Sequence, residues 1–424
     1  MKWPSASLGL VAPPERASRQ FGPNEQVWHL NLDQIESQTG KVLSKQRTFA
    51  SEAGNSTFVF DQGNVLYSKL RPYLNKVVHP DEPGIATTEL VPLRPRQGIL
   101  SPGFLKFYLR SDRFVAFANQ VIAGAKMPRM IMDKFWDHEI PLPSIREQQR
   151  IEEILEQADA LRQKRAEADV LADRIIPSIF NQMFGDPAAN KKNWPRKKLG
   201  EMLHSIDSGW SPVCESRQAA PDEWGVLKLG AITTNRYLED ENKALPSALT
   251  SEPTLEVRAG DLLFTRKNTY DLVGACAYVK RTRPKLMLSD LIFRLNLTPN
   301  AEVHLLYLWA LLICPSKRPA IQLLAGGSAG SMPNISKGRL ETLDIETPPF
   351  HLQKAFAATV SSFDNLDERA EKARKNIGTL FATIIHRAYT GELTAQWREA
   401  HMKELLAEME QQARLLRSTT NGRN

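Results

Sequence analysis

The sequence predicts a duplicated fold of the mixed α/β (α+β) class, in which each of two similar modules is followed by one long helix. Three segments recur in the same order later in the chain: residues 63–69, 127–128 and 140–143 return as residues 260–266, 332–333 and 345–348. The interval of about 200 residues is too long for a solenoid repeat, which spans about 20–50 residues. A pseudo-twofold internal repeat is therefore expected, with two similar surfaces on one chain.

The first repeated segment marks a strand. Residues 63–69 read Gly-Asn-Val-Leu-Tyr-Ser-Lys and residues 260–266 read Gly-Asp-Leu-Leu-Phe-Thr-Arg, so every position is matched in chemical kind. Residues 58–60 and 65–67 are apolar or aromatic and flank a turn, which predicts two short strands. One helix is predicted at residues 102–119, because Pro102 suits a first helical turn and the apolar residues behind it share a face.

Two long helices are predicted after the modules. Residues 144–184 carry apolar side chains at gaps of mostly three and four, and the pattern returns at residues 356–389. Ser144 followed by Glu147 has the form of a capping box, and Pro177 is expected to kink or break the first helix. The predicted division is 1–143 for the first module, 144–186 for the first long helix, 187–349 for the second module, 350–391 for the second long helix, and 392–424 for a C-terminal helix and tail.

Composition narrows the class of protein. The 424 residues carry a net charge of +7, with 42% hydrophobic and 24% charged residues, which is ordinary for a globular chain and favours a polyanionic partner. The three cysteines are far apart, so neither a zinc site nor a disulfide framework is indicated, and a reducing compartment fits. No signal-peptide pattern or membrane-length apolar run is found, which predicts a cytoplasmic location without membrane contact.

Several motifs together carry a family resemblance. They are Leu66-Tyr67-Ser68-Lys69-Leu70-Arg71-Pro72-Tyr73-Leu74, Thr87-Thr88-Glu89-Leu90, Pro141-Leu142-Pro143 with Glu147-Gln148, and Gly391-Glu392-Leu393-Thr394. With the duplication, the chain resembles the specificity (S) subunit of a type I restriction–modification system over nearly its whole length. It departs from the family pattern at Phe350-His351-Leu352-Gln353, which is a weaker match than the first copy, and at Pro177.

The resemblance implies a fold and a function. Two target recognition domains would each read one half of a bipartite, asymmetric site in double-stranded DNA, and two long antiparallel coiled-coil helices would set the distance between the halves. The subunit would not be catalytic. It would dock two methyltransferase (M) subunits, which bind S-adenosylmethionine and methylate adenine at N6. Where restriction (R) subunits are present, two of them would add translocation and cleavage that depend on ATP and Mg²⁺.

DNA binding requires cations for phosphates and guanidinium or amide groups for base edges. The candidate residues are Lys69, Arg71, Lys76, Lys126 and Arg129 in the first module and Arg266, Lys267, Asn268, Lys337 and Arg339 in the second, with Lys280, Arg281, Arg283 and Lys285 as further cations. The alternative is that these are solvated surface charges. Repetition favours binding at Lys69 and Arg266, and at the cations flanking the two Met-Pro turns. The glycine-rich residues 325–331 are expected to face the DNA backbone or to form a plain flexible turn.

The long helices need a partner for their apolar stripes. The residues expected to pair the helices or to bind partner subunits are Ile151, Leu155, Leu161, Ile175, Ile179, Val360, Phe363, Leu366, Ile377 and Ile384. This role has no catalytic content.

Three rival interpretations remain open. The first is a self-contained methyltransferase or nuclease. Thr347-Pro348-Pro349-Phe350 resembles the adenine methyltransferase motif, but Thr347 replaces the required Asn or Asp, and the eight histidines show no metal-site spacing. The second is a scaffold that does not bind DNA. The third is an S-like partner of a fused restriction–methylation enzyme.

Overall fold

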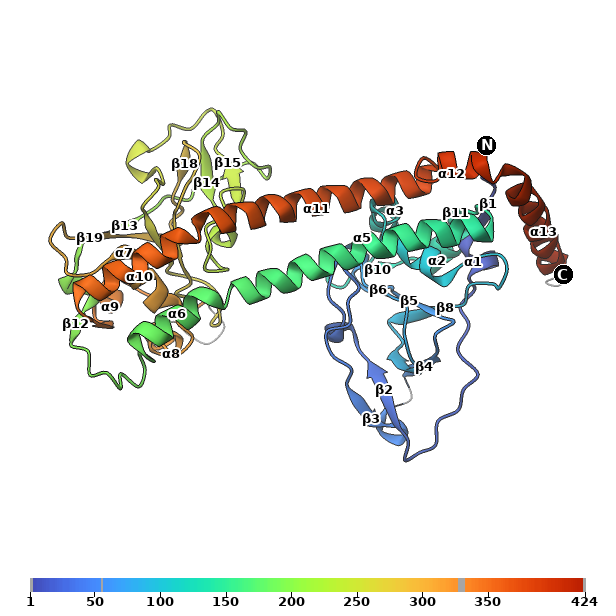
Figure 1. Cartoon of the computed structure of the whole chain (residues 1–424), viewed down its shortest axis with the longest axis horizontal. Coiled ribbons are helices and arrows are strands. Elements are labelled where there is room, and N and C mark those ends of the chain that lie inside the picture. Colours follow the sequence, from blue (N-terminus) through green and yellow to red (C-terminus); the bar gives the residue numbers. More distant parts are fainter. Residues whose placement is uncertain (1–2, 55, 327–331, 422–424) are drawn as a thin grey trace. The chain divides into compact units, whose positions relative to one another are not determined.

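The chain folds into two compact units, one for each repeat. The computed structural model describes residues 3–54, 56–326 and 332–421. Unit 1 contains residues 1–166 and 371–424, and unit 2 contains residues 167–370. The chain therefore leaves unit 1 within the first long helix and returns to it within the second. The mixed α/β architecture, with two domains linked by long helices, confirms the fold class expected from the sequence (Figure 1).

Unit 1 consists of short strands, short helices and parts of the two long helices. Its elements are β1 (Ser5–Ser7), α1 (Leu8–Val11), β2 (Gln26–Leu30), β3 (Arg47–Phe49), β4 (Thr57–Phe60), β5 (Val65–Ser68), β6 (Val77–Val78), β7 (Gly84–Thr87), β8 (Leu90–Leu93), α2 (Pro102–Leu109), α3 (Asp112–Gln120), β9 (Ile122–Ala123), β10 (Arg129–Met130), α4 (Met132–Asp137), β11 (Glu139–Pro141), the first part of α5 (Ile145–Ala172), the last part of α11 (Asp364–Thr390), α12 (Ala395–Ala400) and α13 (Met402–Asn421).

Unit 2 repeats this plan. Its elements are the end of α5, α6 (Ile175–Phe184), β12 (Arg196–Lys198), β13 (Leu203–Ser208), β14 (Gly225–Leu227), β15 (Asn242–Ala244), β16 (Leu262–Thr265), β17 (Cys276–Tyr278), β18 (Leu286–Met287), β19 (Ile292–Leu297), α7 (Leu305–Ile313), α8 (Arg318–Leu323), α9 (Lys337–Glu341), β20 (Asp344–Glu346), α10 (Phe350–Ser362) and the start of α11.

The repeated sequence segment is the central strand of equivalent sheets. β5 lies between β6 and β8, and β16 lies between β17 and β19, with antiparallel pairing throughout. All four residues of each central strand are buried, as expected for a strand covered on both faces. A second sheet contains one parallel pair in each unit, β2 with β7 and β14 with β18. Both the strand prediction and the duplication are therefore confirmed.

The repeated Pro-rich segment leads into each long helix through a buried glutamine. Gln148 Nε2 donates to the carbonyls of Ile99 (2.9 Å) and Pro143 (2.9 Å), and its Oε1 accepts from Ser101 N (2.8 Å). Gln353 makes the same three bonds in unit 2, to Glu302 O (3.2 Å), to Pro348 O (2.8 Å) and from His304 N (2.9 Å). Both side chains are fully buried. Their hydrogen bonds join the start of the long helix to the loop before α2 in unit 1 and to the loop before α7 in unit 2.

In unit 1 the two long helices run antiparallel. Near the start of α5, the Glu147 carboxylate contacts Thr394 and Arg398 beyond the end of α11, whereas the Arg162 guanidinium lies over the Phe381 ring at 4.5 Å. Residues later in α5 therefore contact residues that come earlier in the chain on the α11 side, which is the antiparallel arrangement. Figure 1 shows the two helices side by side in this unit.

Two helix predictions were wrong in detail, whereas the break expected near Pro177 is confirmed. The helix expected at 102–119 is two helices, because Ser111 Oγ accepts from Phe114 N (3.3 Å) and starts α3 anew. As expected from Pro177, the first long helix breaks at residues 173–174, because the missing N–H of the proline leaves the carbonyl four residues earlier without its helical bond. The second breaks at Phe363, just after the Ser362 hydroxyl bonds back to Thr359 O (2.7 Å).

The C-terminal part also differs from expectation. The single C-terminal helix expected within residues 392–424 is divided into α12 and α13 at His401. The Ser144 cap is present, with its Oγ accepting from Glu147 N (3.3 Å). The capping box is not completed, because the Glu147 carboxylate instead accepts from Trp3 Nε1 (3.0 Å), Thr394 Oγ1 (2.6 Å) and Arg398 Nε (2.7 Å).

Candidate nucleic-acid interface

The loop after each central strand is held against the Met-Pro turn by the same backbone hydrogen bonds. In unit 1, Met130 N donates to Lys69 O (2.8 Å) and Arg71 N donates to Pro128 O (2.7 Å). In unit 2, Ile335 N donates to Arg266 O (2.8 Å) and Asn268 N donates to Pro333 O (3.3 Å). We call this pairing of residues 69–71 with 128–130, and of 266–268 with 333–335, the loop ladder. It brings together two segments that the sequence marked separately as repeats.

A further backbone bond fixes where each loop leaves its sheet. Lys69 N donates to Glu89 O and Arg266 N donates to Leu291 O, both at 3.0 Å. The loop is therefore anchored on its sheet side and on its Met-Pro side. Side chains projecting from such a loop keep a defined position, which is what recognition of another molecule requires.

The ladder of unit 1, together with Lys126 two residues before its second segment, presents three of the expected cations. Arg71 and Lys126 are exposed and Lys69 is half-buried, and none of the three forms an ion pair within the described part of the chain. Arg129 is exposed, but its Nη2 and Nε both donate to the Glu89 carboxylate (3.0 and 3.2 Å). The Arg129 guanidinium is therefore held by an ion pair within the unit, whereas the other three side chains form none among the described residues.

Lys76 is placed differently from the other cations of unit 1. Its Nζ donates to Leu32 O at 2.6 Å, and burial lowers the pKa of its ammonium group. The side chain stabilises the loop before β6 in this structure. Lys76 is therefore the candidate of this module that fits a DNA contact least.

The ladder of unit 2 carries a different set of polar side chains. The half-buried Arg266 donates from Nε to Asn334 Oδ1 (3.2 Å), and its guanidinium lies 5.1 Å from the centre of the Phe293 ring. Lys337 Nζ lies 6.0 Å from the same ring, while Lys267 is exposed. Asn268 is buried, and its Nδ2 has no hydrogen-bond partner among the described residues.

Arg339 and the glycine-rich segment complete the candidates of the second module. Arg339 lies on the short helix α9 and donates from Nη1 to Leu324 O (3.3 Å) while remaining exposed. Residues 327–331 of the glycine-rich segment lie outside the described residues. Ala325 and Gly326 are described, and Gly326 exchanges two backbone hydrogen bonds with Asn334 (2.9 and 2.8 Å).

Four further cations of the second module are used inside the unit. Lys280 Nζ contacts the carboxylates of Asp364 (2.7 Å) and Asp367 (2.6 Å), and Arg281 contacts Glu368 (2.6 Å). The two remaining cations donate to backbone carbonyls: Arg283 Nη1 to Glu223 O (3.1 Å) and Lys285 Nζ to Asp222 O (2.7 Å). The sequence does not indicate the partners of Lys280 and Arg281, because the acidic residues at the start of α11 are distant in the chain.

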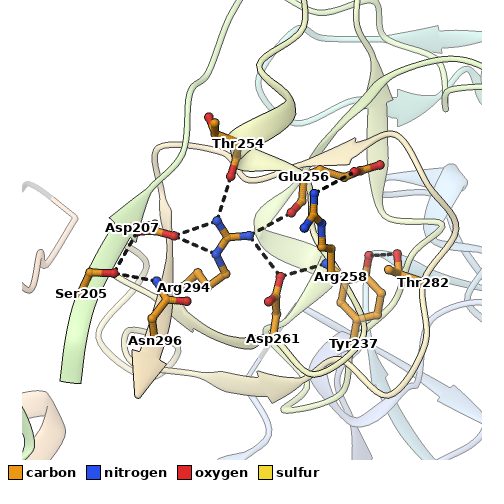
Figure 2. Close-up of polar contacts among 10 residues, drawn as sticks. All are labelled: Ser205, Asp207, Tyr237, Thr254, Glu256, Arg258, Asp261, Thr282, Arg294 and Asn296. Carbon is orange, nitrogen blue, oxygen red and sulfur yellow. Dashed lines mark hydrogen bonds and ion pairs between the residues drawn. The ribbon is translucent and has the colours of Figure 1, made fainter. Parts of the chain in front are cut away.

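A half-buried arginine supports the strand from which Arg266 departs. Figure 2 shows Arg294 between two carboxylates: its Nη2 donates to Asp207 Oδ2 (2.7 Å) and its Nη1 to Asp261 Oδ2 (3.3 Å). The same guanidinium donates to the carbonyls of Thr254 and Glu256 (both 2.9 Å). The arginine therefore joins β13, β19 and the turn before β16, and its charge is compensated within the unit.

The expected helix residues divide between core and surface. Ile151 and Leu155 are fully buried in the core of unit 1 with Ile384 packed beside them, and Val360 is fully buried in unit 2 with Ile179 beside it. Phe363 and Ile377 are half-buried. The exposed members are Leu161 in unit 1 and Ile175 and Leu366 in unit 2. The apolar stripe is thus only partly covered within the chain.

Two other classes of site find no support in the described residues. In residues 3–54, 56–326 and 332–421, no group of three or more His, Cys, Asp or Glu side chains is arranged to hold a metal ion. Within the same ranges, no helix combines the length and the apolar character that crossing a membrane requires.

Comparison with known proteins agrees with the resemblance found in the sequence. Residues 191–377 match the family described as "Type I restriction modification DNA specificity domain". The chain is 35% identical over 188 residues to the EcoEI specificity subunit of Escherichia coli, covering 43% of this chain and 31% of that protein. It is 24% identical over 326 residues to the EcoKI specificity subunit of E. coli K12, covering 72% and 68%.

A solved structure supports the fold alone. The S subunit of a type I restriction–modification system from M. genitalium superimposes with a TM-score of 0.51 at 13% identity, covering 91% of this chain and 96% of that one. The fold and the repeated ladder define a duplicated protein with two similar domains. In sequence, this chain is similar to the specificity subunits of type I restriction enzymes, with the family match over residues 191–377.

Proposed function

We propose that this chain is the non-catalytic DNA-recognition subunit of a type I restriction–modification complex, with residues 1–143 and 187–349 as its two target recognition domains. The observation that carries the proposal is the loop ladder. It occurs once in each unit, it is fixed by the same backbone bonds, and it presents cations in both copies. Each ladder is proposed to contact one half of a bipartite site in double-stranded DNA.

The side chains on the two ladders differ, which supports an asymmetric site. The positions of Arg71 and Arg129 in unit 1 are taken by Asn268 and Asn334 in unit 2, on the same backbone framework. A guanidinium pairs best with guanine in the major groove, whereas an amide pairs best with adenine. Two copies of one scaffold can therefore read two different half-sites.

The long helices are proposed to bind two M subunits. Apolar residues on them remain exposed, at Leu161 and Leu380 in unit 1 and at Val170, Leu171, Ile175 and Leu366 in unit 2. S-adenosylmethionine would be bound by the M subunits, and ATP with Mg²⁺ by two R subunits where these are present. Leu161→Glu is expected to weaken capture of an M subunit by the chain without changing the half-sites that are read.

The experiment that tests the proposal is co-expression with a candidate M subunit from the same genome, followed by size-exclusion chromatography and sequencing of N6-methyladenine in host DNA. We expect a complex of two M to one S and methylation at one split motif. A chain that associates with no methyltransferase and yields no methylated motif would favour the scaffold interpretation. Methyl transfer by the purified chain alone would favour the enzyme interpretation.

The charge of the ladder gives a second test. Lys69→Ala and Lys126→Ala are each expected to lower the slope of log affinity against log salt by about 1, the contribution of one phosphate contact. Arg146→Ala is the matched control, because Arg146 is an exposed cation on α5 whose partners are Glu404 and Glu408. An equal change of slope in all three variants would contradict the assignment of the ladder.

The helices give a third test. Deletion of one or two turns between Ala160 and Ala172 is expected to shorten the spacer between the two halves of the motif while leaving the halves themselves unchanged. An unchanged spacer in a variant that still methylates DNA would contradict the role of the helices in setting the distance.

A further inference from the structure

An exposed tyrosine follows each ladder at the same place. Tyr73 lies two residues after Arg71, and Tyr270 lies two residues after Asn268, which occupies the equivalent ladder position. Their exposed fractions are 43% and 57%. One exposed aromatic ring would need no explanation. The same ring left uncovered at the equivalent position of both copies indicates a shared role.

In unit 1 the backbone of this loop is rigidly held. Tyr73 sits in a single 3₁₀ turn, Pro72–Leu74, between Arg71 (φ 49°) and Asn75 (φ 50°), both in the left-handed region. Asn75 Nδ2 donates to Arg110 O (3.1 Å), and Gln38 Nε2 donates to the carbonyl of Tyr73 itself (2.9 Å). The main chain at the tyrosine is fixed although its ring is not covered.

In unit 2 other side chains achieve the same result. Gln322 Nε2 donates to Tyr270 O (3.0 Å), and Arg318 Nη2 donates to Asp271 O (3.1 Å) and Val273 O (2.7 Å). No hydrogen bond to the hydroxyl of either tyrosine is found within the described ranges. A ring on a fixed loop loses little conformational freedom when it is covered by a ligand, so it is well suited to binding.

Each ladder also exposes a methionine beside the tyrosine loop. Met127 and Met332 are 47% and 51% exposed, and each precedes the proline whose carbonyl accepts the ladder bond from residue 71 or 268. Both copies therefore combine uncovered apolar side chains with cations such as Lys126 and Lys267. This mixture fits a nucleic acid, which offers anionic phosphates next to apolar base faces and deoxyriboses.

We propose that Tyr73 and Tyr270 each pack their ring against bases or deoxyriboses of the duplex half-site bound by their own module. This proposal rests on the proposed function and adds specific contact residues to it. The phosphate-binding cations set the position of the loop, and the ring supplies contact area within the groove. Partial unstacking of a base step by such a wedge depends on the DNA sequence, so the contact contributes to specificity as well as affinity.

The test uses the full chain in complex with its M subunits and a labelled duplex that carries the methylated split motif. Tyr73→Ala and Tyr270→Ala are each expected to weaken binding about tenfold, the size of one base–aromatic contact. Tyr73→Phe and Tyr270→Phe are expected to stay within about twofold of the wild type, since the ring is retained. Phe350→Ala is the matched control, because Phe350 is an aromatic residue 37% exposed at the start of α10.

Two further duplexes, each with one half-site scrambled, assign the rings to their halves. The loss caused by Tyr73→Ala should disappear with one scrambled duplex, and the loss caused by Tyr270→Ala with the other. The proposal would be overturned if the Ala variants lost less than about twofold in DNA affinity, or if the Phe variants lost as much as the Ala variants. It would also be overturned if scrambling the same half-site abolished the effect of both Ala variants. A loss of M-subunit binding at unchanged DNA affinity would assign the rings to a protein surface instead. In all these outcomes the wild-type complex still binds the motif, whereas a wild type without any motif contradicts the proposed function itself.

Discussion

The C-terminal segment of unit 1 is anchored by a buried ion pair, and breaking this pair gives the sharpest test of the structure. Glu147 is fully buried, and Arg398 has a side chain 9% exposed at 2.7 Å from it. Thr394 Oγ1 and Trp3 Nε1 donate to the same carboxylate. Glu147→Ala leaves the arginine buried without its counter-charge, and loss of one partner of such a pair costs about 3–5 kcal/mol.

The adjacent residue supplies the control. Arg146 contacts Glu404 (2.5 Å) and Glu408 (2.9 Å) on α13, but its side chain is 56% exposed. Pairs in such a solvated setting contribute about 0–1 kcal/mol. Both residues thus join the start of α5 to the C-terminal segment, and they differ chiefly in burial.

Hydrogen exchange read by mass spectrometry measures the difference. A cost of about 3 kcal/mol lowers protection about a hundredfold in any segment that opens without the pair. Peptides from α12 and α13 should therefore lose protection by about this factor in Glu147→Ala and by less than about fivefold in Arg146→Ala. Equal losses in the two variants, or unchanged protection of α12 in Glu147→Ala, would refute the reasoning from burial.

Three further predictions follow from buried polar groups. Burial lowers the pKa of His138 to about 4 from 6.5, so the unfolded chain binds the proton first; unit 1 should lose stability as the pH falls from about 6.5 to about 4, and His138→Phe should flatten this dependence of the urea midpoint. Gln353→Leu should destabilise unit 2 by about 2–4 kcal/mol, since it leaves buried carbonyls unpaired. Gln148→Leu should cost less in unit 1, because Gln412 Nε2 donates to the same two carbonyls (2.7 and 3.3 Å). Burial raises the pKa of the Cys276 thiol, so iodoacetamide should label it in the folded chain far more slowly than the other two cysteines.

The features that could be predicted from the sequence are those in which local pattern and repetition coincide. Residues 63–69 and 260–266 predicted equivalent strands correctly, because burial of a central strand restricts the chemical kind of each of its side chains. The sequence shows Gln148 and Gln353 only as residues of two corresponding segments, whereas the structure shows that they form the same three hydrogen bonds. Repetition in one sequence thus identified positions under structural constraint without assigning their function.

Partners distant in the chain account for most of what the sequence could not show. Lys280 and Arg281 carry the composition expected of DNA contacts, and only folding brings them to the acids of α11. Glu147 has the spacing of a capping box, yet Arg398 offers its carboxylate a stronger, charge-assisted bond in a buried setting. Tyr73 lies within a motif of the family resemblance and Tyr270 lies in none, and the exposure of both depends on which side chains fold over them.

The cores show why the two repeats cannot be treated as separable domains. In unit 1, Tyr389 of α11 packs edge-on to Phe104 with ring centres 5.1 Å apart. In unit 2, Phe184 of α6 packs in the same way against Tyr307 at 4.9 Å. Each module is therefore completed by the end of the long helix that belongs to the other repeat. A chain ending after the first long helix would keep residues 1–186 but lack Phe381, Ile385 and Tyr389, and the apolar face around Phe104 would be uncovered. The duplication thus yields modules whose cores each depend on a helix end from the other repeat.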